Sequence, residues 1–145
     1  MNAYPSIIHK TITINAPVSA VWNALTEPQL MKAWMLDTEI NIVTDWIVGN
    51  PFRIIGNLHW TDFETKGTVL RFDPGKVVSY SFLSSLSEQP DEPENYSIIE
   101  FSLTAKENET TVDLMLRNFP TEVIYRHLLF YWTVTLQELK KFAER

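Results

Sequence analysis

The chain has 145 residues, of which 45% are hydrophobic, which is enough apolar material for one packed core but leaves little room for a second. Its formal net charge is −6 and its few basic residues are scattered, which argues against a nucleic-acid or anionic-membrane partner. The sequence contains no cysteine, so disulfides, thiolate metal sites and a cysteine nucleophile are excluded.

The N-terminal residues lack the basic and apolar regions of a secretory signal peptide. No apolar run approaches the roughly 18 residues that a membrane span requires. The sequence therefore predicts a cytoplasmic protein without a membrane span. No internal repeat, linker or low-complexity tract divides it, so we expect one domain over residues 1–145.

The first predicted elements are a strand and two short helices. Residues 7–14 are rich in β-branched side chains and predict a strand. Pro17 suits the first turn of a helix, and residues 17–25 have the spacing of a short amphipathic helix. Thr26 and Gln29 have capping-box spacing, which predicts that a second short helix begins there.

After the second helix, the apolar residues recur with the two-residue period of strands. Gly56 marks a bend or bulge within one of these strands, and a tight turn is predicted at residues 73–75. An acidic loop that contains prolines follows at residues 84–95. The predicted strands cover residues 40–44, 52–60, 63–72, 77–83, 96–104 and 112–116.

The last predicted element is one long amphipathic helix over residues 121–143, with Thr121 as its N-cap. Helical spacing places Leu128, Trp132 and Leu139 on its inward face. Alternating strands give the sheet one apolar face, and this helix is the only large element able to cover it. The order predicts an α+β helix-grip fold, a curved antiparallel sheet around the C-terminal helix, with an aromatic-lined cavity between them.

Several segments resemble the START-like, Bet v 1-like (SRPBCC) superfamily and, within it, the domain related to the C-terminal half of the Hsp90 ATPase activator. The segments are ITINAP at 12–17, VWNALT at 21–26, WM at 34–35, DWIVGNPFR at 45–53, KGTV at 66–69, FDP at 72–74, VSYSF at 78–82 and Trp132 with LQELK at 136–140. Each is weak alone, but their order and spacing cover nearly the whole chain. The resemblance implies the helix-grip fold, which hosts carriers, cyclases and regulators alike.

The sequence lacks the motifs of the common catalytic and metal centres. His9, His59 and His127 are too far apart in sequence for a helical pair of metal ligands. Neither a Gly-x-Ser-x-Gly elbow nor a glycine-rich phosphate loop occurs. We therefore expect no catalytic residue, no metal and no cofactor.

Large side chains, most of them aromatic, are the candidate ligand-binding residues, because phenol and indole groups add a polar handle to an apolar surface. The candidates are Trp34, Met35, Trp46, Trp60, Tyr80, Phe82, Tyr131 and Trp132. Four of them, Trp34, Trp60, Tyr80 and Tyr131, are predicted to contact a common internal cavity. The alternative is that these residues simply fill the core. The first interpretation is an intracellular binding domain for a small hydrophobic or aromatic ligand.

Two other functions stay open. The resemblance implies a chaperone-associated interaction protein of the Hsp90 activator type. A cyclase- or hydrolase-like enzyme would use a cavity carboxylate such as Glu64 or Glu100. In addition, Val123, Phe130 and Val134 form an apolar stripe on the outer face of the last helix, which predicts a homodimer or protein-partner surface unless neighbouring loops cover it.

Overall fold

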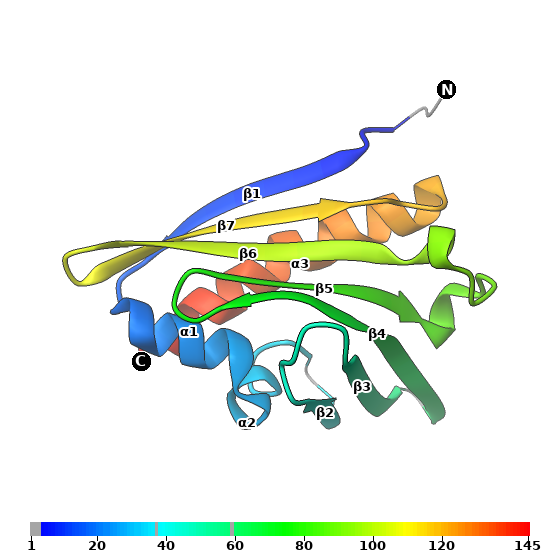
Figure 1. Cartoon of the computed structure of the whole chain (residues 1–145), viewed down its shortest axis with the longest axis horizontal. Helices are drawn as coiled ribbons and strands as arrows, with labels where there is room; N and C mark the ends of the chain where they lie inside the picture. The colour runs from blue at the N-terminus through cyan, green and yellow to red at the C-terminus, as the bar shows by residue number, and fades with distance from the viewer. Residues whose placement is uncertain (1–3, 37, 59) are drawn as a thin grey trace.

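The computed structural model of the chain describes residues 4–36, 38–58 and 60–145. These residues form one seven-stranded antiparallel sheet, with the long helix α3 running behind it in Figure 1. The strands are β1 Ile7–Ile14, β2 Ile40–Thr44, β3 Pro51–Leu58, β4 Thr61–Asp73, β5 Val77–Ser84, β6 Ser97–Lys106 and β7 Glu109–Arg117. The helices are α1 Val18–Thr26, α2 Pro28–Met31 and α3 Glu122–Ala143, with 3-10 turns at Ser85–Ser87 and Pro93–Asn95.

The order of strands across the sheet is β1-β7-β6-β5-β4-β3-β2. From β2 to β7, each strand pairs with the next one along the chain. The exception is β1, which pairs with β7 from Ile7 opposite Arg117 to Ile14 opposite Thr110. The first and the last strand of the sequence are therefore neighbours, and β1 and β2 form the two edges of the sheet.

Alternation along the strands separates a buried face from an exposed one. In β7, Val112, Leu114 and Leu116 are fully buried, while Asp113 and Met115 between them face the other side. The buried residues face α1 and α3, and we call this the inner face of the sheet. The opposite, outer face carries most of the charged side chains of the strands.

Helix α3 covers the inner face as the sequence predicted. Its N-cap Thr121 accepts a hydrogen bond from the Ile124 N–H at 3.2 Å, and Leu128, Trp132 and Leu139 are buried. This confirms the α+β helix-grip fold and the orientation of the helix. None of the helices in the described ranges is long and apolar enough to cross a membrane.

The C-terminal turn of α3 is tied to the end of β1. Lys140 Nζ donates to the Thr13 carbonyl at 2.8 Å, and Glu144 Oε2 accepts from the Asn15 N–H at 2.7 Å. Glu144 accepts hydrogen bonds from Lys140 and from the Asn15 N–H, and these bonds lower its pKa. The carboxylate is therefore charged at neutral pH. These contacts hold the helix along the sheet.

The predicted capping box at Thr26 and Gln29 is wrong. Thr26 is the buried last residue of α1, and its hydroxyl donates to the Trp22 carbonyl at 2.8 Å. Glu27 precedes α2 and makes no side-chain cap. A threonine hydroxyl that is buried near a helix carbonyl bonds to it instead of reaching the following turn.

The strands differ from their predicted ranges mainly at the hairpins. β4 and β7 begin at Thr61 and Glu109, because ladder pairing continues through polar residues that show no hydrophobic alternation. The register shift lies between Val69 and Arg71, whereas the sequence pointed to Gly56. β3 ends at Leu58, two residues before the predicted end.

Candidate functional site

Two groups of aromatic rings lie on the inner face, and together we call them the aromatic layer. In the first group, Tyr80 of β5 stacks on Phe52 of β3 with ring centroids 3.9 Å apart, and Trp46 lies 6.0 Å from Tyr80. In the second group, the ring centroid of Trp132 in α3 lies 5.1 Å from that of Tyr131 and 6.3 Å from that of Trp34. The layer therefore joins the sheet, α3 and the segment that follows α2.

Hydrogen bonds to backbone carbonyls fix the polar tips of three of these rings. The Trp34 Nε1–H donates to the Ala24 carbonyl at 2.9 Å, and the Trp46 Nε1–H donates to the Thr26 carbonyl at 2.6 Å. The Tyr131 hydroxyl donates to the Met35 carbonyl and so links α3 to the segment after α2. Satisfied indole and phenol groups keep these large side chains in single orientations.

Trp46 reaches its place through an unusual backbone conformation. Its φ of 57° lies in the left-handed region, which a residue with a bulky side chain rarely adopts. Asp45 next to it accepts hydrogen bonds from the Ile47 N–H at 2.9 Å and the Asn50 amide at 2.7 Å, and these bonds shape the turn. The surrounding structure thus holds Trp46 in a strained conformation that presents its ring to Tyr80.

The two tyrosines of the layer stay neutral over the physiological range. Burial raises the pKa of Tyr131 to about 12, and burial together with the nearby Tyr131 raises the pKa of Tyr80 as well. A neutral phenol can donate or accept a hydrogen bond but is a poor base at neutral pH. These two tyrosines therefore offer no general base at neutral pH.

The structure brings together seven of the eight candidate ligand-binding residues. Trp34, Met35, Tyr80 and Trp132 are buried, and Trp46, Phe82 and Tyr131 are half-buried against the core. Trp60, by contrast, is 97% exposed in the turn between β3 and β4, so the prediction that it contacts an internal cavity is wrong. Because β3 ends at Leu58, strand alternation no longer sets the direction of Trp60. His59 lies outside the described residues.

The outer face of the sheet carries two open pockets that the sequence analysis missed. The larger, which we call the outer pocket, has a volume of about 500 Å³, and a neighbour of about 430 Å³ shares Ile98 and Asn118 with it. The outer pocket is lined by Pro51, Arg53, Glu64, Lys66, Gly67, Thr68, Leu70, Ser81, Pro93, Tyr96, Ile98 and Asn118. It lies on the side of the sheet opposite to the predicted cavity.

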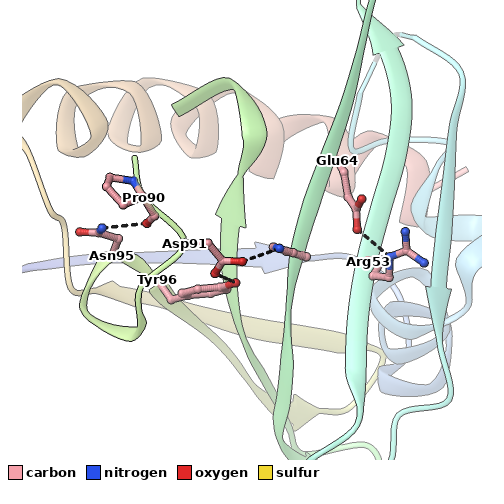
Figure 2. A network of polar contacts seen from close by, with 7 residues as sticks. Arg53, Glu64, Pro90, Asp91, Asn95 and Tyr96 are labelled. Carbon is pink, nitrogen blue, oxygen red and sulfur yellow. Dashed lines mark hydrogen bonds and ion pairs between the residues drawn. The ribbon is translucent and has the colours of Figure 1, made fainter. Parts of the chain in front are cut away.

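A wall of the outer pocket is the loop of residues 85–96, and polar contacts hold this loop against the sheet. Lys66 of β4 forms an ion pair with Asp91 at 2.5 Å, and the Tyr96 hydroxyl donates to the same carboxylate at 2.6 Å. Within the loop, the Asn95 amide donates to the Pro90 carbonyl at 2.9 Å. Figure 2 shows this network. Asn118 adds hydrogen bonds to two carbonyls of this region.

The charges of the outer pocket compensate one another. Arg53 Nε donates a hydrogen bond to Glu64 Oε2 at 2.7 Å, and this bond lowers the pKa of Glu64. Figure 2 shows the two side chains pointing toward each other. The hydrogen bonds from Lys66 and Tyr96 lower the pKa of Asp91. Both carboxylates therefore remain ionised at neutral pH and are unsuited to act as acids there.

The two carboxylates that the sequence offered as catalytic groups of an enzyme do not face the space between the sheet and α3. Glu64 lies opposite Ile55 on the outer face, and Glu100 lies between the inward-facing Ile99 and Phe101. The expectation that either residue lines a cavity between sheet and helix is wrong. The alternation of the two strands was visible in the sequence, but which face meets α3 was decided by the packing.

The apolar stripe on α3 is exposed in the structure. Val123, Phe130 and Val134 are 76%, 72% and 47% exposed, so neighbouring loops do not cover them. They lie on the side of α3 that faces away from the sheet, opposite to Leu128 and Leu139. Large apolar side chains that line up in this way are typical of interaction surfaces.

The curved sheet wrapped on α3 and the aromatic layer between them define a Bet v 1-like (SRPBCC) domain. Residues 15–144 match the family model described as activator of Hsp90 ATPase homolog 1-like protein, and the chain belongs to this family. A search of the curated proteins found no match.

Solved structures agree with this assignment. The protein ChR145 from Cytophaga hutchinsonii is 35% identical, with a TM-score of 0.82 over 99% of this chain and 97% of that one. The Aha1 dimer from Colwellia psychrerythraea is 25% identical, with a TM-score of 0.72 over 95% of this chain and 96% of that one. CV1439 from Chromobacterium violaceum, at 17% identity and a TM-score of 0.80 over 97% and 99%, shares the fold.

Proposed function

We propose that this protein binds a small hydrophobic or aromatic ligand between the sheet and α3. The observation that carries the proposal is the pair of neutral phenols, Tyr80 and Tyr131, within a layer of buried aromatic rings. An apolar body with one or two polar atoms would match both the rings and the hydroxyls. A cytoplasmic location is part of this proposal.

Entry of the ligand would involve the contact between α3 and the segment after α2. The Tyr131 hydroxyl and the Met35 carbonyl close the layer on that side, and Tyr131 and Trp46 are its half-buried members. The outer pocket and its neighbour open on the other face of the sheet. We therefore propose that α3 and this segment separate when a ligand enters, and that Tyr131 then donates its hydrogen bond to the ligand.

The test combines native mass spectrometry of gently purified protein with titration of an apolar fluorescent probe such as an anilinonaphthalene sulfonate. We expect a co-purified small molecule or probe binding that quenches tryptophan emission. Tyr80→Phe should weaken probe binding by about 5-fold, the loss of one hydrogen bond, whereas Trp60→Phe at the exposed turn should not. An absence of any bound molecule together with equal probe binding by both variants would contradict the proposal.

A second proposed function is protein binding through the exposed stripe on α3. It is supported by the exposure of Phe130 and by the similarity to a protein that forms an Aha1 dimer. By analogy with the family description, an Hsp90-type chaperone is the foreign partner to test. Addition of the protein should raise the ATPase rate of the chaperone, and Phe130→Glu should remove that effect. An unchanged ATPase rate would exclude this partner.

A further inference from the structure

Four side chains at four-residue spacing form a ridge along the exposed face of α3. They are Arg126, Phe130, Val134 and Glu138, and we call them the α3 ridge. All four are exposed, and the order along the helix is cation, apolar, apolar, anion. When two copies of this ridge lie side by side in opposite directions, each charged side chain faces one of opposite charge. Each apolar side chain then faces an apolar one.

We propose that the α3 ridge is the contact surface for a second copy of this chain, with the two α3 helices antiparallel. The inference rests on the proposed use of this helix face for protein binding and identifies the partner and the register. In a two-fold symmetric contact, Arg126 of each copy faces Glu138 of the other, and Phe130 faces Val134. The same arrangement thus forms twice.

The geometry of helix packing permits this register. Side chains four residues apart form ridges inclined to the helix axis, and packing such ridges from two helices gives a crossing angle of about −50°. At that crossing, two antiparallel ridges run alongside each other from end to end. The crossing point then lies between Phe130 and Val134, and the charged residues lie at the two ends of the contact.

Electrostatics favours a second copy in antiparallel orientation. A parallel arrangement would bring Arg126 beside Arg126 and Glu138 beside Glu138, which places like charges together. Within its own helix, Arg126 Nη2 lies 2.7 Å from Glu122, and Glu138 lies 3.6 Å from Lys141. The antiparallel contact adds opposite charges to these pairs, so each end of the interface becomes an alternating network of four charges.

The ridge adds no repulsion of its own to self-association. Each chain carries a formal net charge of −6, so two copies repel each other at long range. The ridge itself is neutral because it holds one cation and one anion. Phe130 supplies the aromatic anchor that commonly carries much of the binding energy of an interface. Because one helix crossing buries little area, we expect a reversible dimer of micromolar affinity.

The experiment exchanges the charges one at a time. In Arg126→Glu, two carboxylates face each other at both ends of the dimer, and in Glu138→Arg, two guanidinium groups do. Sedimentation velocity, at concentrations up to about 500 µM, should show a dimer for wild type and a dissociation constant raised about 10-fold or more for each variant. An equimolar mixture of the two variants should dimerise again, because both charge contacts are then between opposite charges.

The mixture of the two variants is the decisive measurement. An effect of either substitution on its own helix would persist in the mixture, whereas a charge contact between two chains would be restored. If wild type stays monomeric at that concentration, both the self-association and this register are overturned. If wild type is a dimer but the mixture is no more dimeric than its components, the register is overturned and the dimer uses another surface. Probe binding to the aromatic layer, measured in the same samples, reports separately on the ligand proposal.

Discussion

Gly67 lies where β4 passes close to β5, and no other residue type fits there without movement of the backbone. A Cβ atom at this position would lie 1.7 Å from the Ser81 carbonyl oxygen. We expect Gly67→Ala to lower the free energy of unfolding by about 3 kcal/mol or more, because backbone atoms have to shift. Urea denaturation followed by tryptophan fluorescence measures this loss.

Gly75→Ala is the matched control. Gly75 has a φ of 75°, and a Cβ atom there has nothing within 4 Å. Its replacement adds only the strain of the left-handed region, about 1 kcal/mol. Equal losses in the two variants would show that the close approach of the strands does not constrain Gly67.

Tyr131 makes the stability of the protein sensitive to alkaline pH. Burial raises its pKa from 10.0 to about 12, so the native state keeps the proton that the unfolded state loses. The stabilisation is fully present below pH 10 and is lost as the pH rises toward 12. This difference in the pKa of Tyr131 between the unfolded and the native state corresponds to about 2–3 kcal/mol of unfolding free energy.

The dependence is measured as the urea midpoint between pH 9 and pH 12. Tyr131→Phe has no phenol to ionise, so its midpoint should fall less steeply than that of the wild type over this range. The variant should also be less stable at neutral pH by about 1 kcal/mol, since the bond to the Met35 carbonyl is lost. Parallel curves for the two proteins would show that Tyr131 is not protected from ionisation.

At the scale of the element, α3 depends on one buried stripe. Leu139 is fully buried against the sheet, and Leu139→Asp would bury an uncompensated charge. We expect a loss of several kcal/mol, about 4, or failure to fold at all. Gln137→Asp, on the exposed side of the same turn, should change the melting temperature little. Similar melting curves for both variants would contradict the observed orientation of the helix.

The loop of residues 85–96 is held by charge and should loosen in acid. Asp91 accepts from Lys66 and Tyr96, and these bonds lower its pKa below the ordinary 3.8. Its contribution is therefore present above pH 3.8 and is lost as the pH falls below that value. Hydrogen exchange of the loop amides should become faster in Asp91→Asn at pH 7, while exchange in β7 stays unchanged. Unchanged loop exchange would mean that other contacts hold the loop.

At the scale of the whole molecule, the sheet is completed by pairing its first strand with its last one. β1 pairs with β7 over eight residue pairs, about a hundred positions apart in the chain. Such distant contacts make folding slow, because much of the chain loses its freedom before they form. Stopped-flow dilution from urea should show refolding in milliseconds to seconds. A complete recovery of tryptophan fluorescence within microseconds would contradict this.

Much of the fold could be predicted from the sequence because helices, strands and caps depend on residues that are close together in the chain. Helical spacing identified the buried face of α3 from Leu128, Trp132 and Leu139, and Thr121 was found from its capping chemistry. Alternation located six of the seven strands approximately, and the β-branched residues of β1 located the other. The exposed stripe with Phe130 follows from the same periodicity.

The tertiary structure alone decided what each face meets. The sequence predicted the same ligand-binding role for Trp60 and Trp46. Trp60 is exposed in a turn, whereas Trp46 is held within the aromatic layer. Arg53 and Glu64 are 11 positions apart but form an ion pair, because the register of β3 and β4 brings them together. Periodicity reports which residues share a face, whereas strand register and loop placement are set by packing between distant segments, and these determine pockets and partners.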